Sequence, residues 1–333
     1  MPSTRVFIFI MFGLRSIYIC AAASLMGIAV LLSPCPAQEP QTPILRTETH
    51  LVDFTFSVRR ADGTLVNDLN REDFAITEDS VPQKLAFFGK EAELPLTLGL
   101  IVDVSDSQSK FFKRHRKDIE KFLNTVMRPQ DEAFSICFGD HLRVTSDKTA
   151  SISSVMEQLE RFDKGERNYP ELASEDNRDK QSGGGTALYD AIYYSVGAKL
   201  AQASGRRHAL ILFTDGEENS SAHDLLDAID AARENDTLIY AIRYTDEKEL
   251  TPHSRQGIAA LHHLSSETGG SDFDALHVNI SEAFEQIATE LRSLYSVGYY
   301  TTNKKRDGTF RRVVVTTTDP AYSVRARTGY YAR

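Results

Sequence analysis

The chain has 333 residues, 41% of them hydrophobic and 26% charged, which suits a globular protein with room for about two domains. Its formal net charge of −9 argues against a protein that binds nucleic acid through a surplus of Lys and Arg. Its three cysteines exclude a miniprotein built on disulfides.

Residues 1–37 have the pattern of a secretory signal peptide. Two arginines precede an apolar stretch at 17–32, and a segment of small residues and prolines follows it. This order predicts cleavage after Ala37 and export, with no transmembrane span left afterwards. Two alternatives remain: the same stretch is kept as a membrane anchor, or Cys35 carries a lipid.

The segment 38–93 is expected to form β-strands. From Leu45 to Phe88 the apolar and polar residues alternate as in antiparallel strands, and Asp62-Gly63 is a turn signal. Strands are expected at 50–58, 65–66, 74–77 and 84–88.

Residues 94–293 are expected to form an α/β domain with a doubly wound, mostly parallel sheet flanked by helices. Continuous apolar runs such as Leu98–Val102 are typical of strands that are buried on both faces. Between such runs lie segments with apolar residues at helical spacing. Strands are predicted at 98–102, 134–138, 209–213 and 238–244, and helices at 110–127, 155–162, 186–203, 222–234, 257–268 and 280–294. The polar segment 163–184 is predicted to be a long loop.

The last segment, 294–333, returns to β character, with strands predicted at 295–300, 311–317 and 322–327. About 40 residues in three strands cannot easily bury a core of their own. We therefore expect this segment to pair with residues 45–92 in a small β-sandwich-like module.

Three polar segments are predicted at the carboxyl ends of strands or before a helix, where ligands gather in open parallel sheets. Their carboxylate and hydroxyl oxygens suit Mg²⁺, Mn²⁺ or Ca²⁺ better than zinc. The segments are Asp103-Val104-Ser105-Asp106-Ser107, Gly183-Gly184-Gly185-Thr186 and Thr214-Asp215-Gly216.

In these segments the chain resembles the von Willebrand factor type A domains. Their metal-ion-dependent adhesion site uses a DxSxS motif, a threonine in a glycine-rich loop and an aspartate in a DG turn. The matching residues, in order, are Asp103, Ser105, Ser107, Thr186 and Asp215. The resemblance implies that they hold a divalent metal, and that a protein ligand supplies an acidic side chain to its open coordination position.

One position departs from the family, whose members commonly have glycine where Asp106 stands. This extra carboxylate either tightens cation binding or repels an acidic ligand. The flanks, at 66–84 and 295–331, resemble those of an exported bacterial subgroup best known from acidobacteria. That resemblance implies a periplasmic or secreted protein.

The resemblance favours an adhesion or assembly module over an enzyme, and we assign no catalytic residue. Two other readings stay open: a metal-dependent, phosphatase-like hydrolase with Asp103 as nucleophile, and a structural domain with a vestigial metal site. The sequence has no G-x-S-x-G or H-E-x-x-H motif. No nucleic-acid partner is expected.

Overall fold

The computed structural model describes residues 51–91, 94–139, 141–172, 185–201, 205–245 and 250–333. The predicted signal peptide, with Cys35 and Ala37, lies outside these residues. Among the helices that are described, none is both long and apolar enough to span a membrane.

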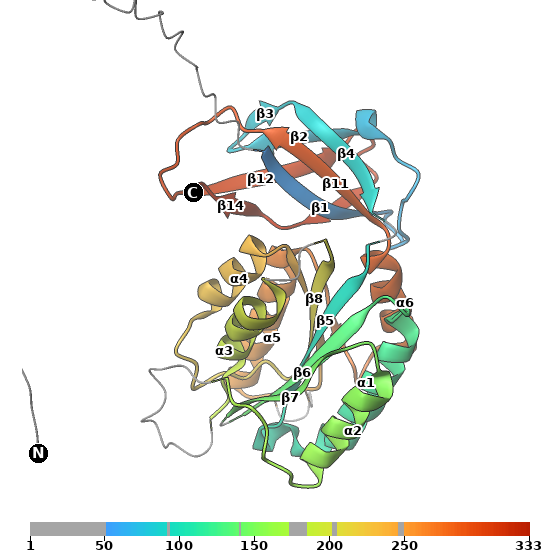
Figure 1. Ribbon diagram of the computed structural model, residues 1–333. Coiled ribbons are helices and arrows are strands. Elements are labelled where there is room, and N and C mark those ends of the chain that lie inside the picture. Colours follow the sequence, from blue (N-terminus) through green and yellow to red (C-terminus); the bar gives the residue numbers. More distant parts are fainter. Residues whose placement is uncertain (1–50, 92–93, 140, 173–184, 202–204, 246–249) are drawn as a thin grey trace, which may run out of the picture. The chain divides into compact units, whose positions relative to one another are not determined.

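A six-stranded sheet is the centre of the α/β part (Figure 1). Its strand order is β10-β9-β8-β5-β6-β7, and all neighbours are parallel except β6 and β7. The strands are β5 (Leu96–Asp103), β6 (Glu132–Phe138), β7 (Leu142–Thr149), β8 (Arg207–Thr214), β9 (Thr237–Arg243) and β10 (Asp272–Asp274). Every residue of β5 is buried, as expected for a strand covered on both faces.

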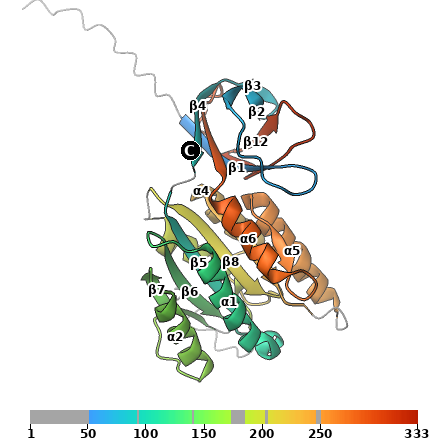
Figure 2. The same cartoon turned by 90° about the vertical axis from the view of Figure 1, so that its right-hand side faces the viewer.

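Helices cover both faces of this sheet. One face packs against α1 (Phe112–Val126), α2 (Ile152–Asp163) and α6 (Ile280–Leu291). The other packs against α3 (Leu188–Ser195), its π-helical continuation η4 (Val196–Leu200), α4 (Leu225–Glu234) and α5 (Pro252–Thr268). Figure 2 shows α1 beside α6, where the rings of Phe122 and Phe284 meet edge to face with centroids 5.2 Å apart.

Two antiparallel four-stranded sheets, which we call the flank sandwich, contain strands from both flanks of the α/β part. Their orders are β13-β1-β11-β4 and β14-β12-β2-β3. The strands are β1 (Leu51–Arg59), β2 (Phe74–Glu78), β3 (Val81–Gln83), β4 (Leu85–Glu91), β11 (Leu294–Tyr300), β12 (Phe310–Thr317), β13 (Ser323–Ala326) and β14 (Gly329–Tyr331).

The two sheets of the flank sandwich share one buried core. The ring of Phe56 on β1 packs edge to face on that of Phe74 on β2, with centroids 5.1 Å apart. Tyr295 on β11 stacks against Phe56 at 5.8 Å, and Val313 and Val315 on β12 complete the cluster. The expected fold class, a mostly parallel sheet flanked by helices with a β module from the two flanks, is confirmed.

Several elements differ from the sequence expectation. Strands β3, β7 and β14 were not anticipated, and the strand expected at 65–66 is only an isolated bridge between Leu65 and Arg59. The helix predicted from residue 186 begins at Leu188, because the N–H of that residue donates to the carboxylate of Glu218 in another loop. It changes to a π-helical turn at Val196.

Candidate metal centre

The candidate site lies where the order of the central sheet reverses. Strand β5 is followed along the chain by β6 on one side, whereas β8 lies on its other side. The loops after β5 and β8 therefore diverge, which leaves room for a ligand at the carboxyl ends of these two strands. Asp103 is the last residue of β5, and Asp215 directly follows β8.

Asp103 is fully buried, at 0% exposure. Its Oδ1 accepts a hydrogen bond from the backbone N–H of Ser105 at 2.9 Å. Its Oδ2 accepts one from the hydroxyl of Thr214 at 2.5 Å. Since Thr214 ends β8, this second bond links the two strands and fixes the orientation of the carboxylate.

The DxSxS segment is tied to the DG turn through hydroxyl and amide groups. The Oγ atoms of Ser105 and Ser107 lie 3.1 Å apart. Oδ2 of Asp215 accepts from the Ser107 hydroxyl at 2.8 Å and from Gln108 Nε2 at 2.6 Å. The 3₁₀ helix η2 (Asp106–Phe111) thus places two donors on one oxygen of Asp215.

The turn after Asp215 depends on a glycine. Gly216 has a φ of +82°, and a Cβ at this position would lie 2.6 Å from the carbonyl oxygen of Gly257 in α5. Only glycine combines this left-handed backbone with so close an approach. The fold therefore requires glycine directly after Asp215 for a steric reason.

The loop that follows the DG turn holds Thr186. The N–H of Thr186 donates to Asn219 Oδ1 at 2.8 Å, and its carbonyl accepts from the N–H of Asn219 at 3.1 Å. Glu218 accepts the N–H of Leu188 at 2.6 Å, at the start of α3. Thr186 itself is 6% exposed. The other two glycines of the predicted loop, at 183 and 184, lie outside the described residues.

A cavity of about 570 Å³ is lined in part by the hydroxyl-bearing residues of the site. Ser105, Ser107 and Thr186 all line it. Asp103 and Asp215 do not, but each is bonded to a residue that does. The structure thus brings the five predicted residues to one end of the sheet, Thr186 through the shared cavity rather than through a direct bond to the aspartates.

Among the described residues, the two carboxylates of the site have no cationic partner. Neither Asp103 nor Asp215 forms an ion pair with a Lys or Arg of the described chain. Burial and the nearby charge of Asp215 raise the pKa of Asp103 to about 7, although Ser105 and Thr214 donate to it. A divalent cation would reverse this cost, because it supplies the missing positive charge.

Other polar residues of the site were not singled out from the sequence. Thr214 orients Asp103, Gln108 donates to Asp215, and Asn219 holds Thr186. Their only signal is that they lie within three residues of the DxSxS or DG motif. Gln108 Oε1 is buried and has no hydrogen-bond partner within the described residues. No group of three or more His, Cys, Asp or Glu side chains is placed to hold a metal in the described ranges, so this site would rely on hydroxyls.

With this geometry in place, the chain belongs to the von Willebrand factor type A domain family, whose model matches residues 98–293. Comparison with curated proteins gives no match.

Several solved structures are similar in fold. BatB from Bacteroides thetaiotaomicron has 16% identity and a TM-score of 0.45, with 60% of this chain and 100% of that chain covered. A von Willebrand factor type A protein from Catenulispora acidiphila has 13% identity and a TM-score of 0.45, with 86% of this chain and 64% of that chain covered. The pilus adhesin SpaC from Lactobacillus rhamnosus GG has 12% identity and a TM-score of 0.41, with 80% of this chain and 48% of that chain covered. Identities this low concern the fold alone.

Proposed function

We propose that this protein is an exported, metal-dependent protein-binding module, acting in adhesion or assembly. One observation carries the proposal: two buried carboxylates that form no ion pair with any described residue are hydrogen-bonded to residues of a cavity whose lining includes three hydroxyl-bearing residues, together with Arg143 and Arg167. A carboxylate and hydroxyl donor set suits Mg²⁺, with Mn²⁺ and Ca²⁺ as alternatives.

In this proposal Ser105, Ser107 and Thr186 offer hydroxyl oxygens to the cation, while Asp103 and Asp215 supply negative charge. Few of the metal's positions are then filled by the protein, and an acidic side chain of a partner protein completes the shell. The bound metal would polarise and hold that carboxylate. Thr214 and Gln108 position the two aspartates through the bonds described above.

Calorimetric titration with Mg²⁺ and Mn²⁺ tests the metal. The wild-type protein should bind one cation weakly, and Asp103→Ala and Thr186→Ala should lose or sharply weaken that binding. His263→Ala is the control, because this exposed side chain lies on α5. Equal cation binding by wild type and Asp103→Ala would place any metal elsewhere and remove the chemical basis of the proposal.

The partner is tested by cross-linking in the native cell envelope, with Mg²⁺ and with EDTA. Capture of a protein in Mg²⁺ but not in EDTA supports the proposal, provided that Asp103→Ala abolishes it. Sequencing the mature N-terminus in the same sample tests export, since cleavage after Ala37 predicts a start at Gln38.

The alternative is a phosphatase-like hydrolase with Asp103 as nucleophile. The carboxylate of Asp103 is buried. One of its oxygens accepts a hydrogen bond from Ser105 and the other accepts one from Thr214, which does not favour attack on a substrate. We expect no metal-dependent hydrolysis of p-nitrophenyl phosphate. Turnover that Asp103→Asn abolishes would favour the enzyme instead.

A further inference from the structure

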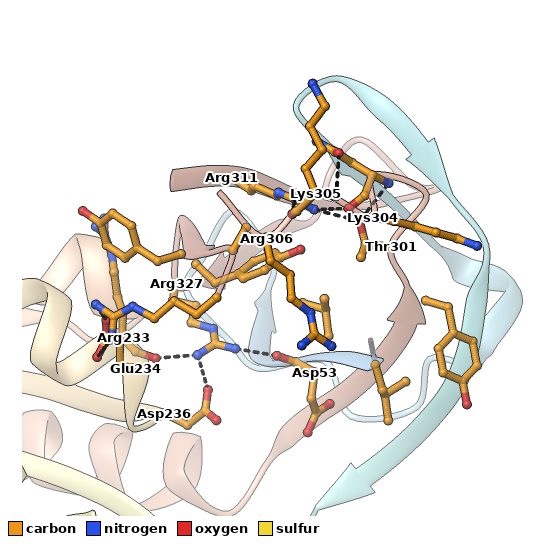
Figure 3. Close-up of a pocket in the computed structure, with 18 residues that line it drawn as sticks. Asp53, Arg233, Glu234, Asp236, Thr301, Lys304, Lys305, Arg306, Arg311 and Arg327 are labelled. Atoms are coloured by element: carbon orange, nitrogen blue, oxygen red, sulfur yellow. Dashed lines mark hydrogen bonds and ion pairs between the residues drawn. The ribbon is translucent and has the colours of Figure 1, made fainter. Parts of the chain in front are cut away.

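A second cavity, of about 620 Å³, lies at the flank sandwich (Figure 3). Its lining comes from the start of β1, the loop between β11 and β12, the C-terminal residues and the end of α4. None of these residues lines the cavity of the candidate metal centre. A volume of this size falls within the range of about 300–1,000 Å³ that is usual for small-molecule sites.

The lining is strongly cationic in a chain whose net charge is negative. Its acidic members are Asp53, Glu234 and Asp236, and its basic members are Arg233, Lys304, Lys305, Arg306, Arg311, Arg327 and Arg333. Figure 3 shows the basic residues 304–306 on one side of the cavity and Arg233, Glu234 and Asp236 on the other. The excess of positive charge favours an anionic ligand.

Part of this charge is already neutralised, and part is not. Arg327 pairs with Asp236 at 2.6 Å, and Arg333 pairs with Glu234 at 2.8 Å. Lys304 and Lys305 form no ion pair with any described residue. The uncompensated charge therefore sits on the loop between β11 and β12.

That loop is held in place by a buried arginine. Arg311 is 2% exposed and pairs with Glu78 at 3.2 Å. Its guanidinium also donates to the backbone carbonyls of Asn303 and Lys305. Gly308 N–H, farther along the loop, donates to the carbonyl of Ala332 at 2.9 Å. The backbone that carries Lys304 and Lys305 is thus fixed before any ligand arrives, which lowers the entropic cost of binding.

The lining also has an apolar share, because Tyr300 is 50% exposed and Leu51 is 53% exposed. The cationic groups suit oxyanions, and the exposed ring and aliphatic side chain suit a carbon skeleton.

We propose that this cavity binds a small organic polyanion, a molecule with at least two phosphate or carboxylate groups on a carbon skeleton. Lys304 and Lys305 neutralise its acidic groups, and Tyr300 and Leu51 contact the skeleton. This site is separate from the metal-dependent one, and its occupant needs no divalent cation.

The test is calorimetric titration of the protein, freed of divalent metal with a chelating resin and kept in a buffer without soluble chelator, with three probes: fructose 1,6-bisphosphate, citrate and fructose. At least one of the two anions should bind, more weakly as salt is added, and fructose should not. A preference for the bisphosphate or for citrate tells phosphate from carboxylate recognition. The double variant Lys304→Gln/Lys305→Gln should bind the anion about tenfold more weakly.

The matched control is Lys113→Gln/Lys117→Gln, which removes the same charge from exposed positions on α1. It should bind the anion as the wild type does, and both double variants should keep the wild-type melting temperature. The proposal is overturned if neither anion binds, if fructose binds equally well, or if the two double variants lose affinity alike. Because the protein is free of divalent metal throughout, none of these outcomes bears on the metal-dependent function.

Discussion

Asp103 illustrates the conflict between stability and function at a single residue. Its carboxylate is buried beside Asp215 without a cation. We expect Asp103→Asn, which keeps the size and removes the charge, to raise the free energy of unfolding in EDTA at pH 8 by about 1–3 kcal/mol. Added Mg²⁺ should stabilise the wild type and not the variant. Urea unfolding with and without Mg²⁺ measures both effects, and equal stabilisation by Mg²⁺ would contradict the assignment.

His115 on α1 makes the stability depend on pH. It is 1% exposed and packs among the rings of Phe111, Phe213 and Tyr244. Burial, with a smaller effect of Arg114, lowers its pKa to about 3, whereas an unfolded histidine has a pKa of about 6.5. The unfolded state therefore takes up the proton first. The stability that His115 contributes is complete above about pH 6.5 and is lost as the pH falls below it.

From pH 7 to pH 5 the protonation of His115 in the unfolded state should lower the free energy of unfolding by about 2 kcal/mol. His115→Phe keeps an aromatic ring in the cluster and removes the titration. Urea unfolding at both pH values should thus show a smaller acid loss for the variant than for the wild type. The same loss in both proteins would mean that other groups cause it.

At the site, the sequence predicted the residues that belong to a motif and missed those that act through geometry. The DxSxS and DG patterns identify Asp103 and Asp215 directly. Gln108 follows the first motif by one position, yet its contact with Asp215 spans 107 residues and exists only once β5 and β8 are neighbours. A contact between residues so far apart leaves no pattern in the local sequence.

Strand β12 shows how alternation along one element divides its residues between core and solvent. Val315 is 7% exposed and lies opposite Ile76 of β2, while its neighbour Val314 is 42% exposed. Val315→Asp should destabilise the flank sandwich by about 3 kcal/mol or more, because it buries an unpaired charge. Amide exchange in β2 should rise accordingly. Val314→Asp, with the same chemical change on the outer face, should leave exchange unchanged; similar effects of both would refute the assigned faces.

The elements with the clearest apolar patterns were also those predicted best. Strand β5 was recognisable because all of its positions are buried. Strand β7 was not, since its Thr145, Ser146 and Asp147 resemble a loop. Thr145 tolerates burial there because its hydroxyl is hydrogen-bonded to that of Ser135 on β6 at 2.7 Å. Such pairing of polar side chains across strands cannot be deduced from either segment alone.

On the scale of the whole described unit, Glu290 links the flank sandwich to the α/β part. This residue of α6 accepts from the Ser57 hydroxyl at 2.5 Å and pairs with Arg59 at 2.7 Å, both on β1. The pair is almost fully buried, with side chains 4% and 1% exposed. Removing one partner of such a pair typically costs about 3–5 kcal/mol.

We therefore expect Glu290→Gln to weaken the contact between the flank sandwich and the α/β part more than it destabilises either of them. The single calorimetric unfolding transition should then split into two. Glu285→Gln, an exposed change on the same helix, is the control and should keep the single transition. A single transition in Glu290→Gln at the wild-type temperature would show that the ion pair does not couple the two parts.

The pairing of distant strands in the flank sandwich also sets the order in which the protein can fold during synthesis. The hydroxyl of Tyr295 bonds to the carbonyl of Val66, 229 residues earlier. Strands β1, β2 and β4 leave the ribosome long before β11 and β12, their partners in the two sheets, exist. Contacts of such long range slow folding. These early strands must therefore wait with unpaired edges while the α/β part is made, and a nascent chain can close its sandwich only after β11 and β12 have been synthesised.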